Sequence, residues 1–218
     1  MQSLFEQYRP RTWDDVIGHQ NLKVAIQRMK ERGSLGGRAF WISGLSGTGK
    51  TTCAYLIAQE VCDPENFIEI DCGDVTPAKL DDLEKSLRYR CLGDKHGRAV
   101  LLNESHGLRK DTVRKLLVVL ERIPNHVCWL FTTTSDGQQS LFEGIDAHPL
   151  LSRCIEFRLE HNRYVAMFAQ RVQEIAEAEG LGGANPGEYV ELAKRCKCNM
   201  RQMLCQVEAG QMLREVLV

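Results

Sequence analysis

GLSGTGKTT, residues 44–52, is the stretch of sequence that decides the fold, because it contains the phosphate-binding pattern G-x-x-x-x-G-K-[ST] in full. A compact apolar run, residues 39–43, precedes it, and a helix-like segment, residues 51–62, follows it. Glycines let a backbone wrap around a phosphate, and the N–H groups at the start of the helix add partial positive charge. A glycine-rich turn that binds nothing is the weaker alternative, since both spacing and context match. The expected phosphate contacts are Gly44, Ser46, Gly47, Thr48, Gly49, Lys50, Thr51 and Thr52.

Two residues of this stretch have expected chemical roles. We expect Lys50 to reach the β- and γ-phosphates of a nucleotide, as the lysine of this pattern does. The Thr51 hydroxyl is expected to ligate Mg²⁺, a hard cation that prefers oxygen.

Apolar strand-like runs alternate with helix-like segments on both sides of this stretch. One helix-like segment begins with Thr76 as N-cap and Pro77 at its first position. Such alternation predicts an α/β fold, with a mostly parallel sheet covered by helices on both faces. The predicted strands are residues 39–43, 67–72, 99–103, 127–134 and 154–159.

The pattern changes after about residue 160, where three helix-like segments, the last of them residues 199–218, follow one another around a single clear loop, residues 180–187. We therefore expect two domains: a nucleotide-binding α/β domain over residues 1–160 and a small all-helical lid over residues 161–218.

Composition limits the class of protein. The 218 residues are 43% apolar and 26% charged, as in a soluble globular protein, and the net charge of -1 gives no global basic field for nucleic acid. No apolar run approaches the roughly 20 residues of a membrane span, and the polar N-terminus lacks an apolar signal core. We expect no membrane partner and a cytoplasmic location, or a nuclear one in a eukaryote.

Nine cysteines occur without any CxxC pair. Zinc sites usually show two close pairs of ligands, and the odd count argues against a disulfide framework. The cysteines are interpreted as small buried hydrophobes in a reducing compartment.

VLLNESH, residues 100–106, places an amide and a carboxylate where a buried strand would emerge. In phosphate-loop folds, a second element of the metal site lies at the end of a neighbouring parallel strand. An Asp is therefore expected at position 103, to hold Mg²⁺ through its water shell, but this chain has Asn103. Glu104 is placed to polarise an attacking water. The amide keeps an acceptor oxygen and loses the charge, at a cost on the order of 1–3 kcal/mol. This predicts weaker Mg²⁺ affinity more than lost nucleotide binding. The alternative is a strand end with two solvated polar residues.

Six segments together resemble the AAA+ ATPases, and specifically the ATPase subunits of sliding-clamp loaders. They follow the order of that family from about residue 4 to residue 208, and the chain stops at Val218, before the helical collar of those subunits. The resemblance implies a subunit that uses ATP and Mg²⁺ to open and load a sliding clamp on primed double-stranded DNA, together with other clamp-loader subunits. The segments are YRPRTWDDVIGHQ, GLSGTGKTT, VLLNESHGL, LFTTT, LLSRCIEFRL and NMRQMLCQVE.

The resemblance also implies roles for residues outside the phosphate loop. Thr133 or Thr134 would lie near the γ-phosphate, with Thr133 the candidate catalytic residue. Arg153 would reach the nucleotide of a neighbouring subunit, and Arg201 that of its own chain. Guanidinium suits both tasks, being always charged and bidentate toward phosphate. A surface arginine, or a solvated helix arginine, is the alternative for each. The residues implied around the adenine are Tyr8, Arg9, Pro10, Val16, Ile17 and Gly18.

The basic stretch GLRKDTVRK, residues 107–115, is a candidate DNA-binding segment. The resemblance implies that a helix start in this region follows a DNA backbone, where phosphate contacts need only positive charge and N–H groups. A solvated helix face is the alternative. The candidate DNA-binding residues are Arg109, Lys110, Arg114 and Lys115.

Two other functions stay open at this point. Asn103 favours a regulatory or structural clamp-loader subunit that binds ATP, hydrolyses it weakly and supplies Arg153 to its neighbour. A different DNA-acting AAA+ ATPase, such as a branch-migration or replication-restart enzyme, is more distant, because the SRC segment, residues 152–154, does not support it.

Overall fold

A computed structural model describes residues 2–91, 93–134, 148–160 and 164–213. The chain forms two compact units. The first, here the sheet unit, comprises Gln20–Leu45 and Gly49–Leu159, and the second, here the helical unit, comprises Met1–His19, Ser46–Thr48 and Glu160–Val218. The predicted division near residue 160 stays a prediction. In the structure, the first 19 residues group with the C-terminal helices.

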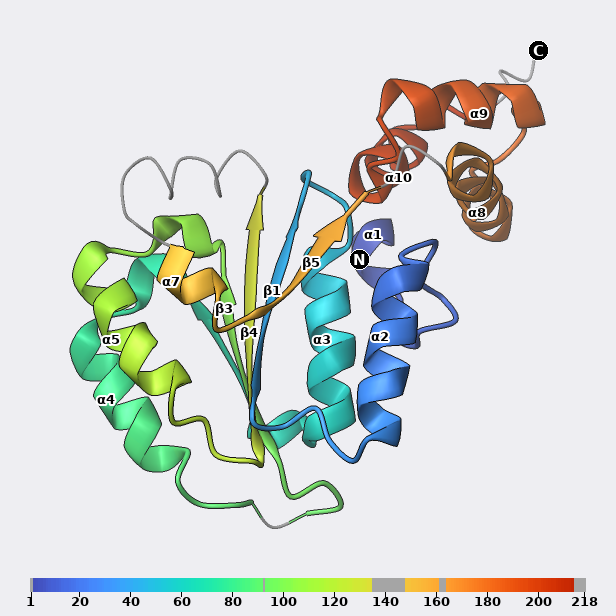
Figure 1. Cartoon of the computed structure of the whole chain (residues 1–218). Helices are drawn as coiled ribbons and strands as arrows, with labels where there is room; N and C mark the ends of the chain where they lie inside the picture. The colour runs from blue at the N-terminus through green and yellow to red at the C-terminus, as the bar shows by residue number, and fades with distance from the viewer. Residues whose placement is uncertain (1, 92, 135–147, 161–163, 214–218) are drawn as a thin grey trace. The chain divides into compact units, whose positions relative to one another are not determined.

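The sheet unit contains five parallel strands in the order β2-β3-β4-β1-β5 (Figure 1). Every predicted strand is confirmed, with bounds that differ by at most one residue at each end. The central strands read as continuous apolar runs because both faces of a parallel sheet are covered. The strands are β1 (Arg38–Gly44), β2 (Phe67–Asp71), β3 (Arg98–Asn103), β4 (Val127–Thr134) and β5 (Ile155–Leu159).

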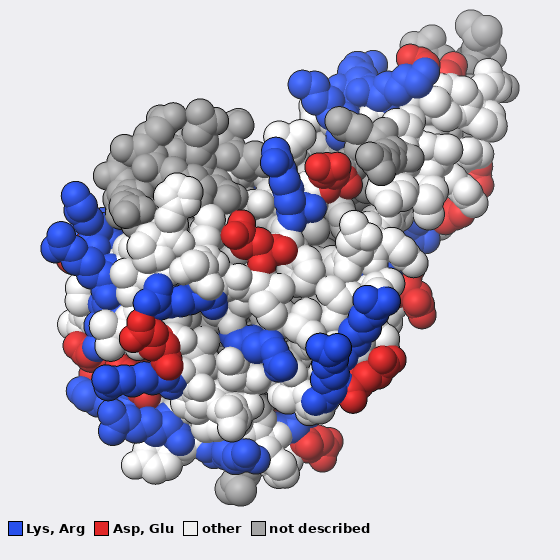
Figure 2. All heavy atoms as spheres, in the orientation of Figure 1, with Lys and Arg blue, Asp and Glu red and all other residues white. Residues whose placement is uncertain are grey.

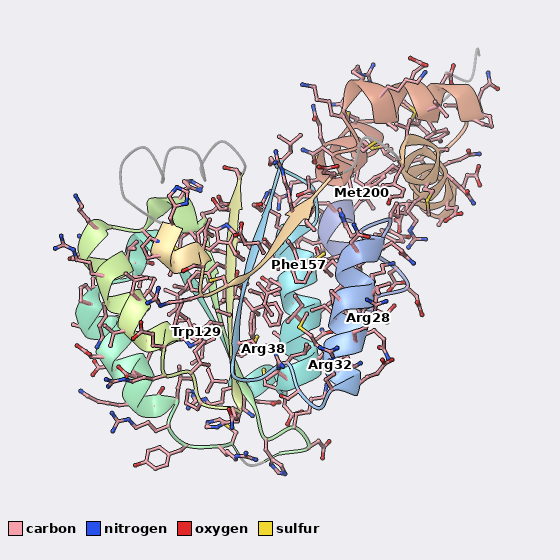
Figure 3. All side chains as sticks on the ribbon, viewed as in Figure 1. Arg28, Arg32, Arg38, Trp129, Phe157 and Met200 are labelled. Carbon is pink, nitrogen blue, oxygen red and sulfur yellow. The ribbon has the colours of Figure 1, made fainter. Side chains whose placement is uncertain are left out.

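Helices cover both faces of this sheet, as predicted (Figure 1). Helices α2 (Gln20–Glu31) and α3 (Lys50–Val61) lie on one face, and α4 (Pro77–Ser86) and α5 (Lys110–Leu120) lie on the other. Figure 3 labels one large side chain on each side of the sheet: Trp129 toward α4 and α5, and Phe157 toward α3. Side chains alternate along a strand, so neighbouring residues of one strand pack against helices on opposite faces of the sheet.

Local signals set several helix boundaries. Thr76 caps α4, because its hydroxyl accepts a hydrogen bond from the Lys79 N–H at 3.2 Å, and Pro77 follows as expected. The shorter elements, each of three or four residues, were not predicted. They are α1 (Leu4–Gln7), η1 (Pro64–Asn66), η2 (Cys72–Asp74), η3 (Ser105–Gly107) and α7 (His148–Leu151).

The helical unit contains α1, α8 (Val165–Ala178), α9 (Pro186–Arg195) and α10 (Met200–Glu208). Its core includes the buried side chains of Leu4, Tyr189 and Met203. The helix-like segment predicted from residue 199 to the end is shorter in the structure. Gly210 has a φ of 80°, which ends the helical hydrogen bonding at Glu208, and residues 214–218 lie outside the described residues.

The cysteines are free thiols, and six of the nine are buried. This agrees with their interpretation as small hydrophobes. No cluster of three or more His, Cys, Asp or Glu side chains could hold a metal ion in the part of the chain that the structure describes. Every helix in the same ranges is too short or too polar to span a lipid bilayer.

Burial predicts a sharp order of thiol reactivity. Desolvation raises the pKa of Cys53, Cys72 and Cys154 to about 12, so these thiols stay protonated near neutral pH, whereas Cys205 is exposed. At pH 8 we expect a disulfide reagent to label Cys205 first and the buried Cys53 and Cys72 and the half-buried Cys154 at least about 100-fold more slowly. Stopped-flow absorbance measures the phases, and Cys205→Ser should remove the fastest one. Rapid labelling of the Cys205→Ser variant at Cys53 or Cys72 would contradict the burial.

Candidate active site

The phosphate loop joins β1 to α3 and has the backbone of a cradle. Gly47 and Gly49 have φ values of 75° and 82°, a region that suits glycine. The side chain of Lys50 is buried, and its Nζ donates to the carbonyl oxygens of Gly44 at 3.2 Å and Leu45 at 2.9 Å. The ammonium is therefore held against the loop that the sequence predicts will wrap the phosphates.

The tip of the loop, Ser46–Thr48, belongs to the helical unit. A Cβ on Gly47 would lie 1.9 Å from Oδ1 of Asn199, so a side chain at this position would force Asn199 to move. Within the same unit, Nε2 of His19 lies 3.2 Å from the carbonyl oxygen of Thr48. Ser46 is exposed, whereas Thr51 and Thr52 are half-buried in the first turn of α3.

Asn103 ends β3 and is bonded on both sides. Its Nδ2 donates to Oε1 of Glu69 on β2, and its Oδ1 accepts from Oγ1 of Thr132 on β4 at 2.7 Å. Tyr55 of α3 donates from its hydroxyl to the other oxygen of Glu69 at 2.7 Å. Sequence reasoning did not single out Tyr55, Glu69 or Thr132, because these contacts depend on strand register.

Glu104 directly follows β3 in a left-handed conformation, with φ 53° and ψ 48°. That conformation costs a non-glycine residue about 1–2 kcal/mol, and such strain collects at functional positions. The Glu104 N–H donates to Oγ1 of Thr132 at 3.4 Å, and the carboxylate lies 3.3 Å from Nδ1 of His106. About half of the side chain is exposed, so the carboxylate is open to water.

The threonines of β4 point to different places. Thr133 is fully buried, and its hydroxyl donates to the carbonyl oxygen of Thr134 at 3.2 Å. Thr132 is the residue that contacts Asn103, and Thr134 follows on the same side of the strand, half-buried. The role of Thr133 near a γ-phosphate stays a prediction.

Arg153 lies between α7 and β5 and is held by its own unit. Its guanidinium forms an ion pair with Glu121, and Nη1 donates to the carbonyl oxygen of Pro149 at 2.8 Å. The hydrogen bond from Arg153 holds the pKa of Glu121 below its ordinary value. Arg201 of the helical unit lies over the ring of Phe5, 5.2 Å from the centroid.

The segment expected around the adenine lies in the helical unit. The Tyr8 hydroxyl donates to Glu179 at 2.7 Å, and this bond raises the pKa of Tyr8. Arg9 forms an ion pair with Glu6. A Cβ on Gly18, whose φ is 74°, would lie 2.6 Å from the ring of Tyr164, so the glycine permits a close approach. The remaining members of the segment are buried Val16 and half-buried Pro10 and Ile17.

The candidate DNA-binding residues fall at the start of α5. Arg109, Lys110 and Arg114 are exposed. Lys115 forms ion pairs with Asp81 and, at 3.4 Å, with Glu84, and the hydrogen bond to Asp81 raises the pKa of Lys115. Figure 2 shows basic side chains over the α4 and α5 side of the sheet unit with acidic ones among them.

Residues 40–178 match the family described as "ATPase family associated with various cellular activities (AAA)". The chain belongs to the AAA family of ATPases. This confirms the family predicted from the sequence segments, and it explains why the phosphate loop lies between a strand and a helix of a parallel sheet.

Curated relatives of this AAA chain carry the name Replication factor C small subunit. The one from Haloarcula marismortui is 32% identical over 180 residues, covering 81% of this chain and 52% of the relative. The one from Halobacterium salinarum is 29% identical over 190 residues, covering 84% and 55%. The chain thus spans about half the length of the curated relatives it matches.

A solved structure of a RuvB variant from Thermotoga maritima shows the same fold as this AAA chain. It has a TM-score of 0.72 and 23% identity, covering 92% of this chain and 64% of that one. At this identity the likeness concerns the fold alone.

Proposed function

We propose that this chain binds and hydrolyses ATP·Mg²⁺ as an AAA+ subunit of a DNA polymerase clamp loader. The phosphate loop carries the proposal, because Gly47 and Gly49 have left-handed backbones and the buried Lys50 lies against the loop. The resemblance to clamp-loader subunits and the name of the relatives, Replication factor C small subunit, support the biological role.

The residues present suit a nucleotide with its metal ion. The loop offers backbone N–H groups, one ammonium from Lys50 and one hydroxyl from Thr51, a donor set matched to phosphate oxygens and Mg²⁺. When bound, Mg²⁺ neutralises charge that develops on the phosphates. Because the described part of the chain offers no cluster of three metal-ligating side chains, phosphates and water would complete the coordination.

Glu104 is the proposed general base. Its carboxylate is open to water at the end of β3, and its backbone is strained and tied to Thr132. In this position it would accept a proton from the attacking water, a contribution of typically about 10²–10⁴ to rate. Asn103 keeps an acceptor oxygen without a charge, a change that by itself would lower Mg²⁺ affinity.

The proposed partners are other clamp-loader subunits, a sliding clamp and primed double-stranded DNA. Arg153 would complete the nucleotide site of a neighbouring subunit, and Arg201 would contact the γ-phosphate of its own. The exposed basic residues at the start of α5 would follow the DNA backbone without reading sequence.

A second candidate function is favoured by Asn103: a subunit that binds ATP, hydrolyses it weakly and serves its neighbour through Arg153. Turnover separates the two functions. We expect purified chain, mixed with primed DNA and a candidate clamp, to hydrolyse ATP faster than it does alone and to elute with the clamp in sizing chromatography. If the chain binds ATP but DNA and clamp do not stimulate its turnover, the second function is supported.

Replacing Lys50 with Ala should weaken ATP binding about 100-fold, since a charge-assisted phosphate contact is lost together with the two carbonyl contacts that shape the loop. Isothermal titration calorimetry with ATP and Mg²⁺ measures the change. Lys79→Ala, at an exposed position on α4, is the matched control and should bind as wild type does. Absence of binding in the wild type would refute both candidate functions.

A further inference from the structure

The amide of Asn103 has a neighbour that fits an amide and conflicts with a carboxylate. Its Nδ2 donates to Glu69, and the hydroxyl of Thr132 donates to its Oδ1 at 2.7 Å. An Asp at position 103 would have no N–H for Glu69 and would set two carboxylates against each other. The loss of charge at position 103 is therefore matched by a carboxylate on the adjacent strand.

Glu69 is held from two sides, in a way that links it to the phosphate loop. Its Oε1 accepts from Asn103, and its Oε2 accepts from the Tyr55 hydroxyl at 2.7 Å. Tyr55 lies four residues after Thr51 on α3, so both side chains are on the same face of that helix. The carboxylate of Glu69 is thus bonded to a side chain that lies one helical turn from Thr51, the residue expected to ligate Mg²⁺.

The other acidic residue on this side of β2 is used locally. Asp71 is paired in register with Asn103, but its Oδ1 accepts a hydrogen bond from the Gly73 N–H at 3.0 Å. Glu69, and not Asp71, is the carboxylate that Asn103 orients.

We propose that Glu69 supplies the negative charge that position 103 lacks at the nucleotide-bound Mg²⁺, and that Asn103 is a positioning residue that orients Glu69. The inference rests on the proposed function, since it concerns the same site. In this proposal the negative charge lies on β2 and the amide on β3, so the expected Asp is replaced by a pair of residues rather than lost.

A double-mutant cycle tests whether Glu69 and Asn103 act as such a pair. The measured quantity is the Mg²⁺ enhancement, the ratio of the Kd for a non-hydrolysable ATP analogue in EDTA to its Kd in Mg²⁺, obtained by calorimetry. Glu69→Gln should lower the enhancement about 10-fold and leave the Kd in EDTA unchanged. Asn103→Asp should raise it about 10-fold in the Glu69→Gln background and less than about 3-fold in wild type, because coupled sites are not additive.

Two further readouts separate positioning from a structural role. The electron paramagnetic resonance spectrum of Mn²⁺ with the analogue should change in Glu69→Gln and return in the double variant, which no loss of folding would produce. Glu65→Gln removes the same charge from an exposed position in η1 and is the matched control, with enhancement and Tm like wild type.

The outcomes that overturn the proposal are distinct from failure of the function. An unchanged enhancement in Glu69→Gln, or an equal gain from Asn103→Asp in both backgrounds, refutes the role of Glu69 while nucleotide binding stands. Absence of analogue binding by wild type, in EDTA and in Mg²⁺ alike, refutes the proposed function and this proposal together.

Discussion

Glu104→Gln is expected to lower ATP turnover about 1,000-fold while the Kd for ATP changes less than about 3-fold. The amide has the shape of the carboxylate and cannot accept a proton from water, so the chemical step slows and binding is spared. Single-turnover hydrolysis, measured beside calorimetric binding, separates these two quantities. The backbone of Glu104 is strained, and its carboxylate is open to solvent.

A second substitution at this position controls for strain. Glu104→Gly should lose turnover to the same extent and keep or raise the Tm, because glycine adopts a φ of 53° without the cost of a Cβ. If Glu104→Gln hydrolysed ATP at the wild-type rate, Glu104 would not be the general base. The weakly hydrolysing regulatory subunit would then be the better interpretation of the chain.

Arg153→Ala is expected to lower turnover about 1,000-fold in an assembly built from this chain, while ATP binding to the isolated chain stays unchanged. The physical reason is that the guanidinium would stabilise charge at the neighbour's phosphates, not at its own. Steady-state ATPase assays of the assembly and calorimetry of the single chain measure the two effects. In the isolated chain Arg153 is bound to Glu121 and to the Pro149 carbonyl, so these contacts must be exchanged on assembly.

Two variants sharpen that experiment. Arg153→Lys keeps the charge and loses the planar, bidentate group, so it should restore little of the turnover. Arg122→Ala removes an exposed arginine next to Glu121 and should behave as wild type. Weaker ATP binding by the isolated Arg153→Ala chain would contradict a role in trans and favour a structural one.

The sheet could be predicted from sequence because its strands are continuous apolar runs separated by helical periodicity and a phosphate-loop pattern. Local capping signals also placed Thr76 at the start of α4. They could not reveal α1, which has only four residues, or the end of α10 at Glu208, where a left-handed glycine outweighs the helical periodicity that continues beyond it.

The candidate site likewise contains residues that the sequence predicts and contacts that it does not. Lys50 and Thr51 are defined by spacing along the chain, so the sequence predicts them directly. The bonds of Asn103 and Glu69 join three strands and one helix, and they depend on which residues strand register and helix packing bring together. A pattern along one strand carries no information about its neighbours' register, so the sequence alone left Asn103 as an uncompensated loss of charge.

The helical unit is assembled from segments that are far apart along the chain. The Leu4 N–H donates to Glu208 across a separation of 204 residues, and α1 contributes buried Leu4 to the same core as α10. Closing so long a loop costs conformational entropy before any contact repays it, and such long-range contacts slow folding. During synthesis α1 emerges long before α10, so the core that receives Leu4 is complete only after α10 has been made.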